Sequence, residues 1–298
     1  MKKAALPAGG VVMEKMFFRK GAGAHAGIRC DAHVHTAFST DSDASVKDML
    51  EAALKKGMDA VCITDHLDLD FPYYEDLGDG AFTFDVEEYV RTLDGLRKEY
   101  AGRLAVRTGI EFGLQPHLAE TYRGLLKEHP FDFVIGSVHL VKGRDPYYRE
   151  AFGKTGDKEL YRAAFEETLE NVKATDAFDV LGHVDYVVRY GKGQAREYSY
   201  LEYADILDEI LRTVVGKGKG IEINTAGIRY GLQFFNPHPD ILRRFRELGG
   251  EIVTVGSDAH KPEDVAGEFG RAAGVLSGCG FRYYAEFEAG KPIFKKLG

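Results

Sequence analysis

The chain has 298 residues, 44% of them hydrophobic, so it can bury the core of one large domain or of two ordinary ones. Its 39 basic and 47 acidic residues leave a formal charge of −8. This acidic balance weighs against DNA or RNA as the main partner, because proteins that bind nucleic acids usually carry a basic surface. No apolar run approaches the roughly 18 residues that a membrane-spanning helix needs, and we expect no secretory signal.

The three cysteines, Cys30, Cys62 and Cys279, are too widely spaced for a disulfide framework or a C-x-x-C motif. Such a pattern suits a reducing compartment, and we expect a cytoplasmic protein. Residues 1–27 are rich in glycine and alanine, and we expect them to form a poorly ordered extension. The remaining residues, 28–298, show no break in composition and are expected to form one domain. The sequence does not indicate an oligomeric state.

After this extension, short apolar runs alternate with amphipathic stretches along the chain. The expected strands lie at 27–30, 59–64, 104–110, 131–138, 178–182, 220–224 and 251–257, with a last strand at 281–285. The expected helices lie at 46–56, 85–100, 117–128, 157–174 and 200–215, from about 239 onward, and at 262–277. This alternation indicates a parallel sheet with crossover helices. Seven such strands without a break predict a closed β/α barrel, with a doubly wound open sheet as the alternative.

Side chains that can bind metals follow six of these seven strands, and the sixth strand ends at Asn224. They are His33, His35, His66, Glu111, His139, His183, Asp258 and His260. In a parallel β/α barrel the carboxyl ends of the strands meet at one rim, where active sites lie. We therefore expect these side chains to converge.

The spacing within the motifs refines this expectation. Three pairs stand two residues apart, which on an extended chain directs both side chains to one face: His33/His35, His183/Asp185 and Asp258/His260. Asp65 and His66 are adjacent and should point in opposite directions. We therefore expect His66 to bind a metal and Asp65 to support it through hydrogen bonds.

Each of these residues also has an ordinary structural explanation when taken alone. A histidine at the end of a strand is more often a hydrogen-bonded structural residue than a metal ligand. Glu111 could cap a helix, and Asp41 could belong to a turn. One metal cluster accounts for all of them together, whereas imidazoles and carboxylates buried at one rim would be costly without a cation.

In this order, the motifs resemble those of the polymerase-and-histidinol-phosphatase (PHP) family. They are Asp31-x-His33-x-His35-Thr36, Thr64-Asp-His66, Gly109-Ile-Glu111, Gly136-Ser-Val-His139, Gly182-His183-x-Asp185 and Ser257-Asp-Ala-His260. Any one of them is weak, but the ordered set covers about residues 29 to 265. The resemblance implies a distorted seven-stranded, TIM-like β/α barrel with up to three divalent metal ions.

The resemblance also implies how the ligands divide. The first metal would be held by His33, His35, Glu111 and Asp258. Glu111 would bridge to a second metal, which His139 and His183 also bind. The third would be held by Asp41, His66 and His260. Zinc, iron and manganese all suit such ligands, and the sequence does not choose among them.

Within the family, the chain most resembles the stand-alone histidinol-phosphate phosphatases of histidine biosynthesis. The features are the long loop after His139, the stretch 223–229, the stretch 237–242, and aspartate at position 41. This implies a phosphoric monoester hydrolase that converts L-histidinol phosphate to L-histidinol and phosphate. The alternative is a PHP phosphoesterase that acts on another small phosphomonoester or a nucleotide. Amide hydrolysis and a non-catalytic module fit the motifs less well.

Three divalent metals with three carboxylates would leave a cationic pocket that favours a phosphate dianion. The expected mechanism is attack by a metal-bridging hydroxide, with Glu111, Asp258 and His260 acting through the cluster. The acid that protonates the leaving group is left open between a metal-bound water and Asp185, which could instead orient an imidazole.

Arginine binds phosphate with its fork of donors, and the candidates on rim loops are Arg144, Arg189 and Arg229. The acidic, aromatic loop 67–84 could meet the cationic end of the substrate.

Overall fold

The structure is a computed structural model that describes residues 27–298 except 194, 196 and 197. The poorly ordered extension expected at residues 1–27 lies, apart from Gly27, outside the described residues.

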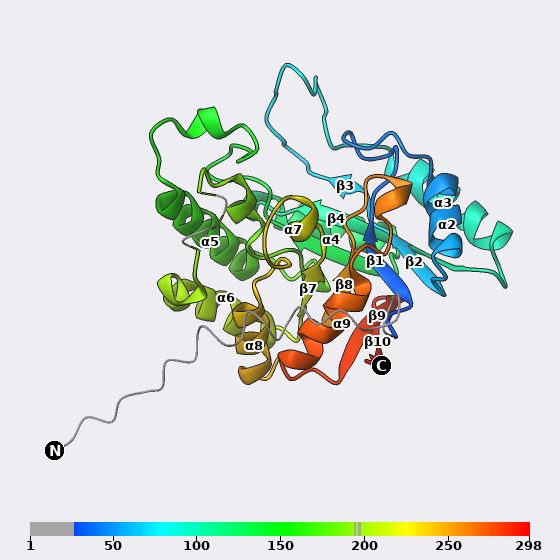
Figure 1. The fold of residues 1–298 in the computed structure, drawn as a ribbon. Helices are drawn as coiled ribbons and strands as arrows, with labels where there is room; N and C mark the ends of the chain where they lie inside the picture. Colours follow the sequence, from blue (N-terminus) through cyan, green and yellow to red (C-terminus); the bar gives the residue numbers. More distant parts are fainter. Residues whose placement is uncertain (1–26, 194, 196–197) are drawn as a thin grey trace.

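A parallel sheet forms the centre of the molecule (Figure 1). Its strands are β1 (Cys30–Val34), β2 (Ala60–Ile63), β3 (His66–Leu67), β4 (Ala105–Gly113), β5 (Phe133–Ser137), β6 (Val180–Leu181), β7 (Gly220–Asn224) and β8 (Val253–Gly256). Their order is β1-β2-β4-β5-β6-β7-β8. The short β3 also pairs with β4, further along than β2 does, so β2 and β3 are two parts of one interrupted strand. The strands are buried almost throughout, as parallel strands with both faces covered are.

The sheet closes on itself beside its first strand. The amide of Asp258 donates to the carbonyl of His33 (2.8 Å), and the amide of His35 donates to the carbonyl of Ala259 (2.9 Å). These bonds join β1 to the segment that follows β8. The result is a seven-stranded TIM-like barrel, so the predicted fold class is confirmed.

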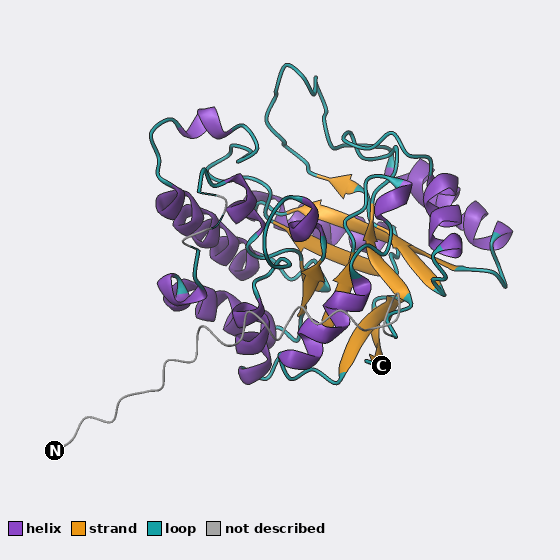
Figure 2. Cartoon of the chain, in the orientation of Figure 1, coloured by secondary structure: helices purple, strands orange, loops and turns teal. Residues whose placement is uncertain are grey.

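Helices surround this sheet (Figure 2). They are α2 (Val46–Lys55), α3 (Val86–Glu99), α4 (Ala119–Glu128), α5 (Asp157–Ala174), α6 (Ala204–Gly216), α7 (Ala226–Arg229), α8 (Pro239–Glu247) and α9 (Phe269–Gly278). Local signals set several boundaries. The hydroxyl of Ser45 caps α2 by accepting from the amide of Asp48 (3.1 Å), and Asp85 caps α3 in the same way through Glu88 (3.1 Å). Pro239 occupies the first turn of α8, where its missing N–H costs nothing.

The helix expected at 262–277 is wrong over its first seven residues. Only a 3₁₀ turn forms there (Pro262–Asp264), and α9 begins at Phe269. Two tertiary contacts hold this segment out of a helix. The Lys56 ammonium donates to the carbonyl of Val265 (2.6 Å), and the amide of Ala266 donates to the buried carboxylate of Asp31 (2.7 Å). Glu268 then takes a positive φ of 61°, which no α-helix accommodates.

A hairpin closes the end of the barrel where the strands begin. It consists of β9 (Tyr283–Glu288), which overlaps the expected strand 281–285, and β10 (Lys291–Lys296), which was not expected. Phe287 packs against Phe133 at the start of β5, with ring centroids 4.9 Å apart. The Arg107 guanidinium, near the start of β4, donates to the Glu286 carboxylate (3.0 Å). With this end covered, the open end of the barrel is the one formed by the carboxyl ends of the strands.

Candidate metal centre

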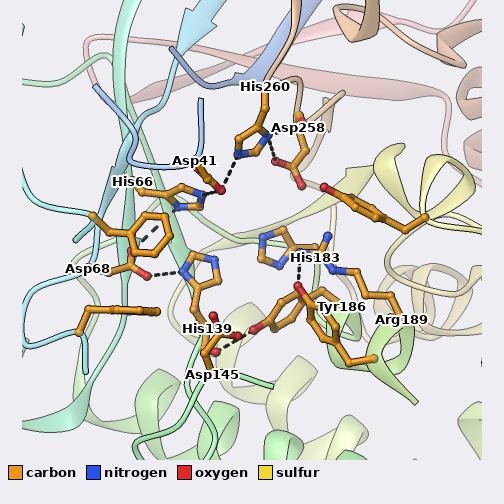
Figure 3. Close-up of a pocket in the computed structure, with 14 residues that line it drawn as sticks. Asp41, His66, Asp68, His139, Asp145, His183, Tyr186, Arg189, Asp258 and His260 are labelled. Carbon is orange, nitrogen blue, oxygen red and sulfur yellow. Dashed lines mark hydrogen bonds and ion pairs between the residues drawn. The ribbon is translucent and has the colours of Figure 1, made fainter. Parts of the chain in front are cut away.

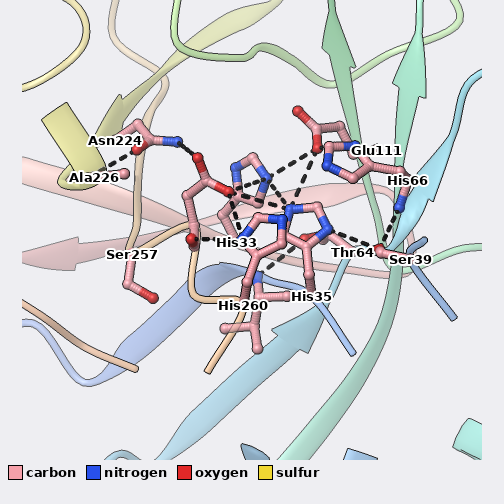
Figure 4. Close-up of polar contacts among 12 residues, drawn as sticks. His33, His35, Ser39, Thr64, His66, Glu111, Asn224, Ala226, Ser257 and His260 are labelled. Atoms are coloured by element: carbon pink, nitrogen blue, oxygen red, sulfur yellow. Dashed lines mark hydrogen bonds and ion pairs between the residues drawn. The ribbon is translucent and has the colours of Figure 1, made fainter. Parts of the chain in front are cut away.

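At the carboxyl ends of the strands, the structure brings together all nine side chains that the sequence suggested as metal ligands (Figures 3 and 4). Four overlapping groups of three lie with their ligand atoms within 4.8 Å of one another: His33/His35/Glu111, Glu111/His139/His183, His35/His66/His260 and His66/Asp68/His139. Asp41 and Asp258 adjoin these groups. We call these ten residues, the nine expected ones and Asp68, the cluster.

Glu111, fully buried near the end of β4, lies between two sets of histidines. Its Oε2 faces His66 Nδ1 (2.9 Å), His33 Nε2 (3.1 Å) and His35 Nε2 (3.4 Å). Its Oε1 faces His183 Nε2 (3.0 Å) and His139 Nε2 (3.3 Å). Each oxygen of Glu111 therefore faces its own set of imidazole nitrogens, so this carboxylate could contribute to two metal sites.

Two aspartates complete the outer parts of the cluster. Asp258 Oδ1 lies 3.3 Å from His35 Nε2 and 3.6 Å from His260 Nδ1. Asp41 Oδ2 lies 3.1 Å from His260 Nε2 and 3.8 Å from His66 Nε2. The set Asp41, His66 and His260 thus meets at one place although its members come from three separate segments.

Glu222, which sequence reasoning missed, anchors the first histidine. Its Oε1 lies 2.6 Å from His33 Nδ1, and its Oε2 accepts from the amide of His183 (3.1 Å). Because a carboxylate only accepts, the neutral imidazole of His33 carries its proton on Nδ1, which leaves the Nε2 lone pair facing the cluster. Glu222 stands two residues before Asn224 on β7, so both point to the barrel interior. That spacing was the available signal.

Asp68 plays the same part for His139 and was also missed. Its Oδ2 lies 2.6 Å from His139 Nδ1, which leaves His139 Nε2 facing Glu111. Its Oδ1 is buried without a hydrogen-bond partner and lies 4.0 Å from His66 Nδ1. Asp68 stands two residues after His66 and directly follows the short strand β3, so the same period-two spacing could have found it.

Asp65 points away from the cluster and supports it indirectly, through the loop after β1. Its carboxylate accepts from the amide of Thr36 (2.6 Å) and from the hydroxyl of Ser39 (2.7 Å). The Ser39 oxygen in turn lies 3.0 Å from His35 Nδ1. A chain of hydrogen bonds therefore orients the imidazole of His35.

The charged groups of the cluster shift one another's pKa values. Burial alone would raise the pKa of Glu111, but the surrounding histidines His33, His66 and His139 outweigh it and hold that pKa well below its usual value. Burial lowers the pKa of His66, and the carboxylates of Glu111 and Asp41 more than offset this and raise it to about 9. The cluster thus binds positive charge strongly, whether protons or metal ions supply it.

The donor set fits divalent metal ions. His66 Nδ1 and His260 Nε2 are buried without a hydrogen-bond partner although carboxylate oxygens lie 2.9 and 3.1 Å away. The ring nitrogens Nε2 of His33 and His35 face each other at 2.9 Å. Converging imidazole nitrogens and carboxylate oxygens are the ligands that zinc, iron and manganese use.

A cavity opens beside the cluster, and we call it the site cavity (Figure 3). It is bordered by cluster members and by Asp145, Arg189, Phe71, Phe82, Tyr186, Tyr190 and Tyr230. Of the three arginines suggested by the sequence, Arg189 borders it. Arg144 does not, and donates to the carbonyl of Ala151 (2.7 Å). Arg229 also lies outside, and donates to the carbonyl of Asp258 (2.7 Å).

Asp185 does not join the cluster, contrary to the expected His183/Asp185 pair. Its carboxylate accepts from the side-chain amide of Asn236 (2.7 Å) and the backbone amide of His238 (2.9 Å). The physical reason is that β6 ends at Leu181, so the backbone is no longer extended at His183 and the period-two rule does not apply.

Comparisons with known proteins place the chain in a family. The PHP domain model matches residues 31–226. A probable histidinol-phosphatase of Clostridium acetobutylicum is 32% identical over 252 residues, which is 85% of this chain and 94% of the relative. The histidinol-phosphatase of Lactococcus lactis is 29% identical over 269 residues, covering 88% and 96% of the two chains.

Two solved structures of similar proteins share the fold of this chain. The crystal structure of histidinol phosphate phosphatase from Lactococcus lactis, complexed with zinc, L-histidinol and phosphate, superposes with a TM-score of 0.81 at 29% identity and covers 89% of this chain and 99% of the other. A putative histidinol phosphatase of Listeria monocytogenes has the same fold, with a TM-score of 0.69 at 21% identity over 79% and 96% of the chains. Within the described residues, the helices are too short or too polar to cross a membrane.

Proposed function

The chain belongs to the PHP domain family, and we propose that it is a metal-dependent phosphomonoesterase that hydrolyses L-histidinol phosphate to L-histidinol and phosphate. This reaction belongs to histidine biosynthesis. The family, the two relatives above and the fold of the Lactococcus lactis enzyme all support this assignment.

One observation carries the proposal: the site cavity joins the cluster to the guanidinium of Arg189. This side chain donates to the hydroxyl of Tyr190 (2.7 Å), and its Nε is buried without a hydrogen-bond partner. Among the described residues, Arg189 forms no salt bridge. The rings of Tyr186, Tyr190 and Tyr230 hold its guanidinium at 4.3–5.0 Å from their centroids. A fixed guanidinium that forms no ion pair within the described part of the chain and lies opposite a metal-binding cluster suits a phosphate dianion.

The residues divide the work as follows. His33, His35, Glu111 and Asp258 would hold one metal, Glu111 with His139 and His183 a second, and Asp41 with His66 and His260 a third. When bound, such ions lower the pKa of a coordinated water and neutralise charge on phosphoryl oxygens. Glu222 and Asp68 fix the tautomers of His33 and His139. Arg189 binds and orients the phosphate.

The experiment is a phosphate-release assay with the purified, metal-loaded protein on L-histidinol phosphate, nucleotides and generic phosphomonoesters. We expect kcat/KM to be highest for L-histidinol phosphate. Equal or higher values for another phosphomonoester or a nucleotide would favour the alternative substrate and overturn this one. In parallel, H33A and E111A should lose bound metal and activity together, which tests the cluster independently of the substrate.

We also propose that the protein acts in the cytoplasm and that nucleic acids are not its partners. Cys30, Cys62 and Cys279 are buried and free of disulfides, in keeping with a reducing compartment. The site cavity is bordered by residues that follow the carboxyl ends of the strands, and it suits a small phosphorylated substrate.

A further inference from the structure

Four carboxylates border the site cavity, and three of them pair with histidines of the cluster. Asp41 pairs with His260 (3.1 Å), Asp68 with His139 (2.6 Å) and Asp258 with His35 (3.3 Å). The fourth is Asp145, in the long loop after β5. Among the described residues, no lysine, arginine or histidine forms a salt bridge with it.

Asp145 is half-buried and forms no ion pair with any described residue. Its Oδ1 accepts from the amide of Tyr147 (2.8 Å), the only hydrogen bond to this carboxylate in the described part of the chain. Burial raises its pKa, and the amide of Tyr147 and the more distant charges of His139 and Arg189 act in the opposite direction without outweighing it. A carboxylate held partly out of water with one donor gains strongly when a cation arrives.

Contacts between two loops fix the position of Asp145. The amide of Asp145 donates to the hydroxyl of Tyr74 (2.9 Å). The rings of Tyr74 and Tyr148 stack at 3.8 Å, and the hydroxyl of Tyr148 donates to Asp76 (2.7 Å). We call these contacts the clasp. They join the loop after β3 to the loop after β5 and fix Asp145 at the mouth of the cavity.

Asp145 also lies on the correct side for a leaving group. Figure 3 shows it beyond His139, on the side of the cavity remote from Asp41 and His260. In the proposed function the phosphate lies between the cluster and Arg189, so the alcohol portion of the substrate would occupy the rest of the cavity, which Asp145 borders. Phe71 and Phe82, with ring centroids 4.8 Å apart, supply an aromatic wall.

We propose that Asp145 is a specificity residue that binds the protonated amino group of the leaving alcohol. This inference rests on the proposed function, because L-histidinol phosphate carries that amino group beside its ester. This amine is not next to a carbonyl and is therefore more basic than a peptide α-amino group, whose pKa is about 7.7–8.0, so it is protonated at neutral pH, whereas an imidazole, with a pKa of about 6.5, is mostly neutral. The ammonium is therefore the group that needs a carboxylate, and the imidazole is the group that suits the aromatic wall.

The test compares D145N with the wild type on two substrates that differ in one group. These are L-histidinol phosphate and its desamino analogue, 3-(imidazol-4-yl)propyl phosphate. We expect the wild type to prefer the former, and the ratio of the two kcat/KM values to fall roughly 10- to 100-fold in D145N, as the loss of one charge-assisted hydrogen bond predicts. Inhibition by L-histidinol should weaken by a similar factor, while inhibition by inorganic phosphate should change much less.

D76A is the matched control, because it removes a contact of the clasp without touching the site cavity. It should leave the substrate ratio unchanged, and an equal fall in D76A would assign the effect to loop geometry and overturn the role of the carboxylate. An unchanged ratio in D145N would also overturn it. Phenyl phosphate separates this failure from that of the proposed function: a wild type that hydrolyses it as well as L-histidinol phosphate contradicts the function itself.

Discussion

Glu222 shows how one buried carboxylate can decide whether a histidine binds a metal. It contacts His33 Nδ1 at 2.6 Å and cannot donate, so it selects the tautomer whose Nε2 lone pair faces Glu111 and His35. An amide in its place can donate to Nδ1 and thereby favour the tautomer with a proton on Nε2, where the metal belongs.

We therefore expect E222Q to lose about 10- to 100-fold in metal affinity or activity, the usual effect of removing such a supporting partner. Bound metal would be measured by elemental analysis after dialysis against a metal buffer, and activity by phosphate release. E286Q is the control, because Glu286 is equally buried but pairs with Arg107 at the opposite end of the barrel. Wild-type metal affinity in E222Q would show that the His33 tautomer is set by other groups.

Arg189 is the residue on which phosphate binding depends in our proposal. In R189M we expect kcat/KM to fall about 10- to 200-fold, because one or two hydrogen bonds to a charged group contribute about 1.5–3 kcal/mol. Inhibition by inorganic phosphate should weaken in parallel. R144M, altered in a guanidinium that donates to the Ala151 carbonyl outside the site cavity, should stay within about twofold of the wild type. Similar losses in both variants would point to a general effect of charge.

Among single residues, the sequence predicts those whose position is fixed by the end of a strand. Eight of the nine expected ligands fall into this class, whereas Asp41 lies in the loop after β1 and was expected from the family resemblance. Glu222 and Asp68 carried the same period-two signal, but an acidic residue inside an apolar strand or an acidic loop has many ordinary explanations. Asp145 could not be found in this way, because its place depends on a contact between two loops, and loop conformation follows no short sequence period.

The hairpin of β9 and β10 is the element that sequence reasoning described least well. The strand β10 reads Lys-Pro-Ile-Phe-Lys-Lys and is mostly exposed, so it lacks the apolar pattern that marks a buried strand. Its partner β9 supplies Ala285 and Phe287, which pack with Ala32, Cys62 and Phe133 at the start of the barrel. The hairpin thus acts as a plug, and only the tertiary structure reveals this.

If the hairpin closes this end of the barrel as a plug, Phe287 should contribute most of the free energy that its packing adds to the stability of the protein. We expect F287A to lower the free energy of unfolding by about 3–5 kcal/mol, as truncation of a buried phenylalanine usually does. Urea denaturation followed by circular dichroism would measure it. F294A, a matched change on β10 where the ring is 47% exposed, should cost less than about 1 kcal/mol. Equal costs at both positions would mean that the hairpin does not pack as a plug.

Asp179, directly before β6, is a partly buried carboxylate whose pKa depends on folding. Asp179 accepts from the amide of Val134 (2.9 Å), and burial raises its pKa to about 6. Because this pKa lies above the value of 3.8 in the unfolded chain, the folded protein holds the extra proton between the two values. The contribution of Asp179 to stability therefore falls as the pH rises from about 4 to about 6.

Asparagine keeps an acceptor for Val134 and has no charge to desolvate. We expect D179N to be more stable than the wild type at pH 7 by about 1–3 kcal/mol, and the difference to shrink toward zero near pH 4. Urea unfolding of both proteins at the two pH values would measure the difference. A difference that is the same at both values would mean that the ionisation of Asp179 does not contribute.

For the whole molecule, the cluster joins segments that are far apart in the sequence. His33 comes from β1 and His35 directly follows it, Glu111 comes from β4, and Asp258 and His260 come from the segment after β8. The order of the strands could be predicted, because alternating strands and helices allow few topologies. The contribution of metal ions to the stability of the barrel could not be predicted, because it depends on distances between side chains from all around the rim.

Those distances lead to an expectation for metal removal. In the folded chain, Glu111 and Asp258 lie close enough to share His33 and His35, so a cation between them offsets their repulsion. A metal that binds only the folded state at 100 times its Kd adds about 2.7 kcal/mol, and each kcal/mol moves the Tm of a chain this large by about 1.6 °C. Chelation should therefore lower the Tm by about 4 °C or more, and zinc or manganese should restore it.

The measurement is differential scanning calorimetry with elemental analysis of the same samples. In E111Q, which lacks the carboxylate common to two of the ligand groups, the Tm should respond much less to chelator. If the wild type loses its metal and keeps its Tm, the cluster serves catalysis alone and the barrel closes without it. The hydrogen bonds between the ends of β1 and β8 would then be sufficient for closure.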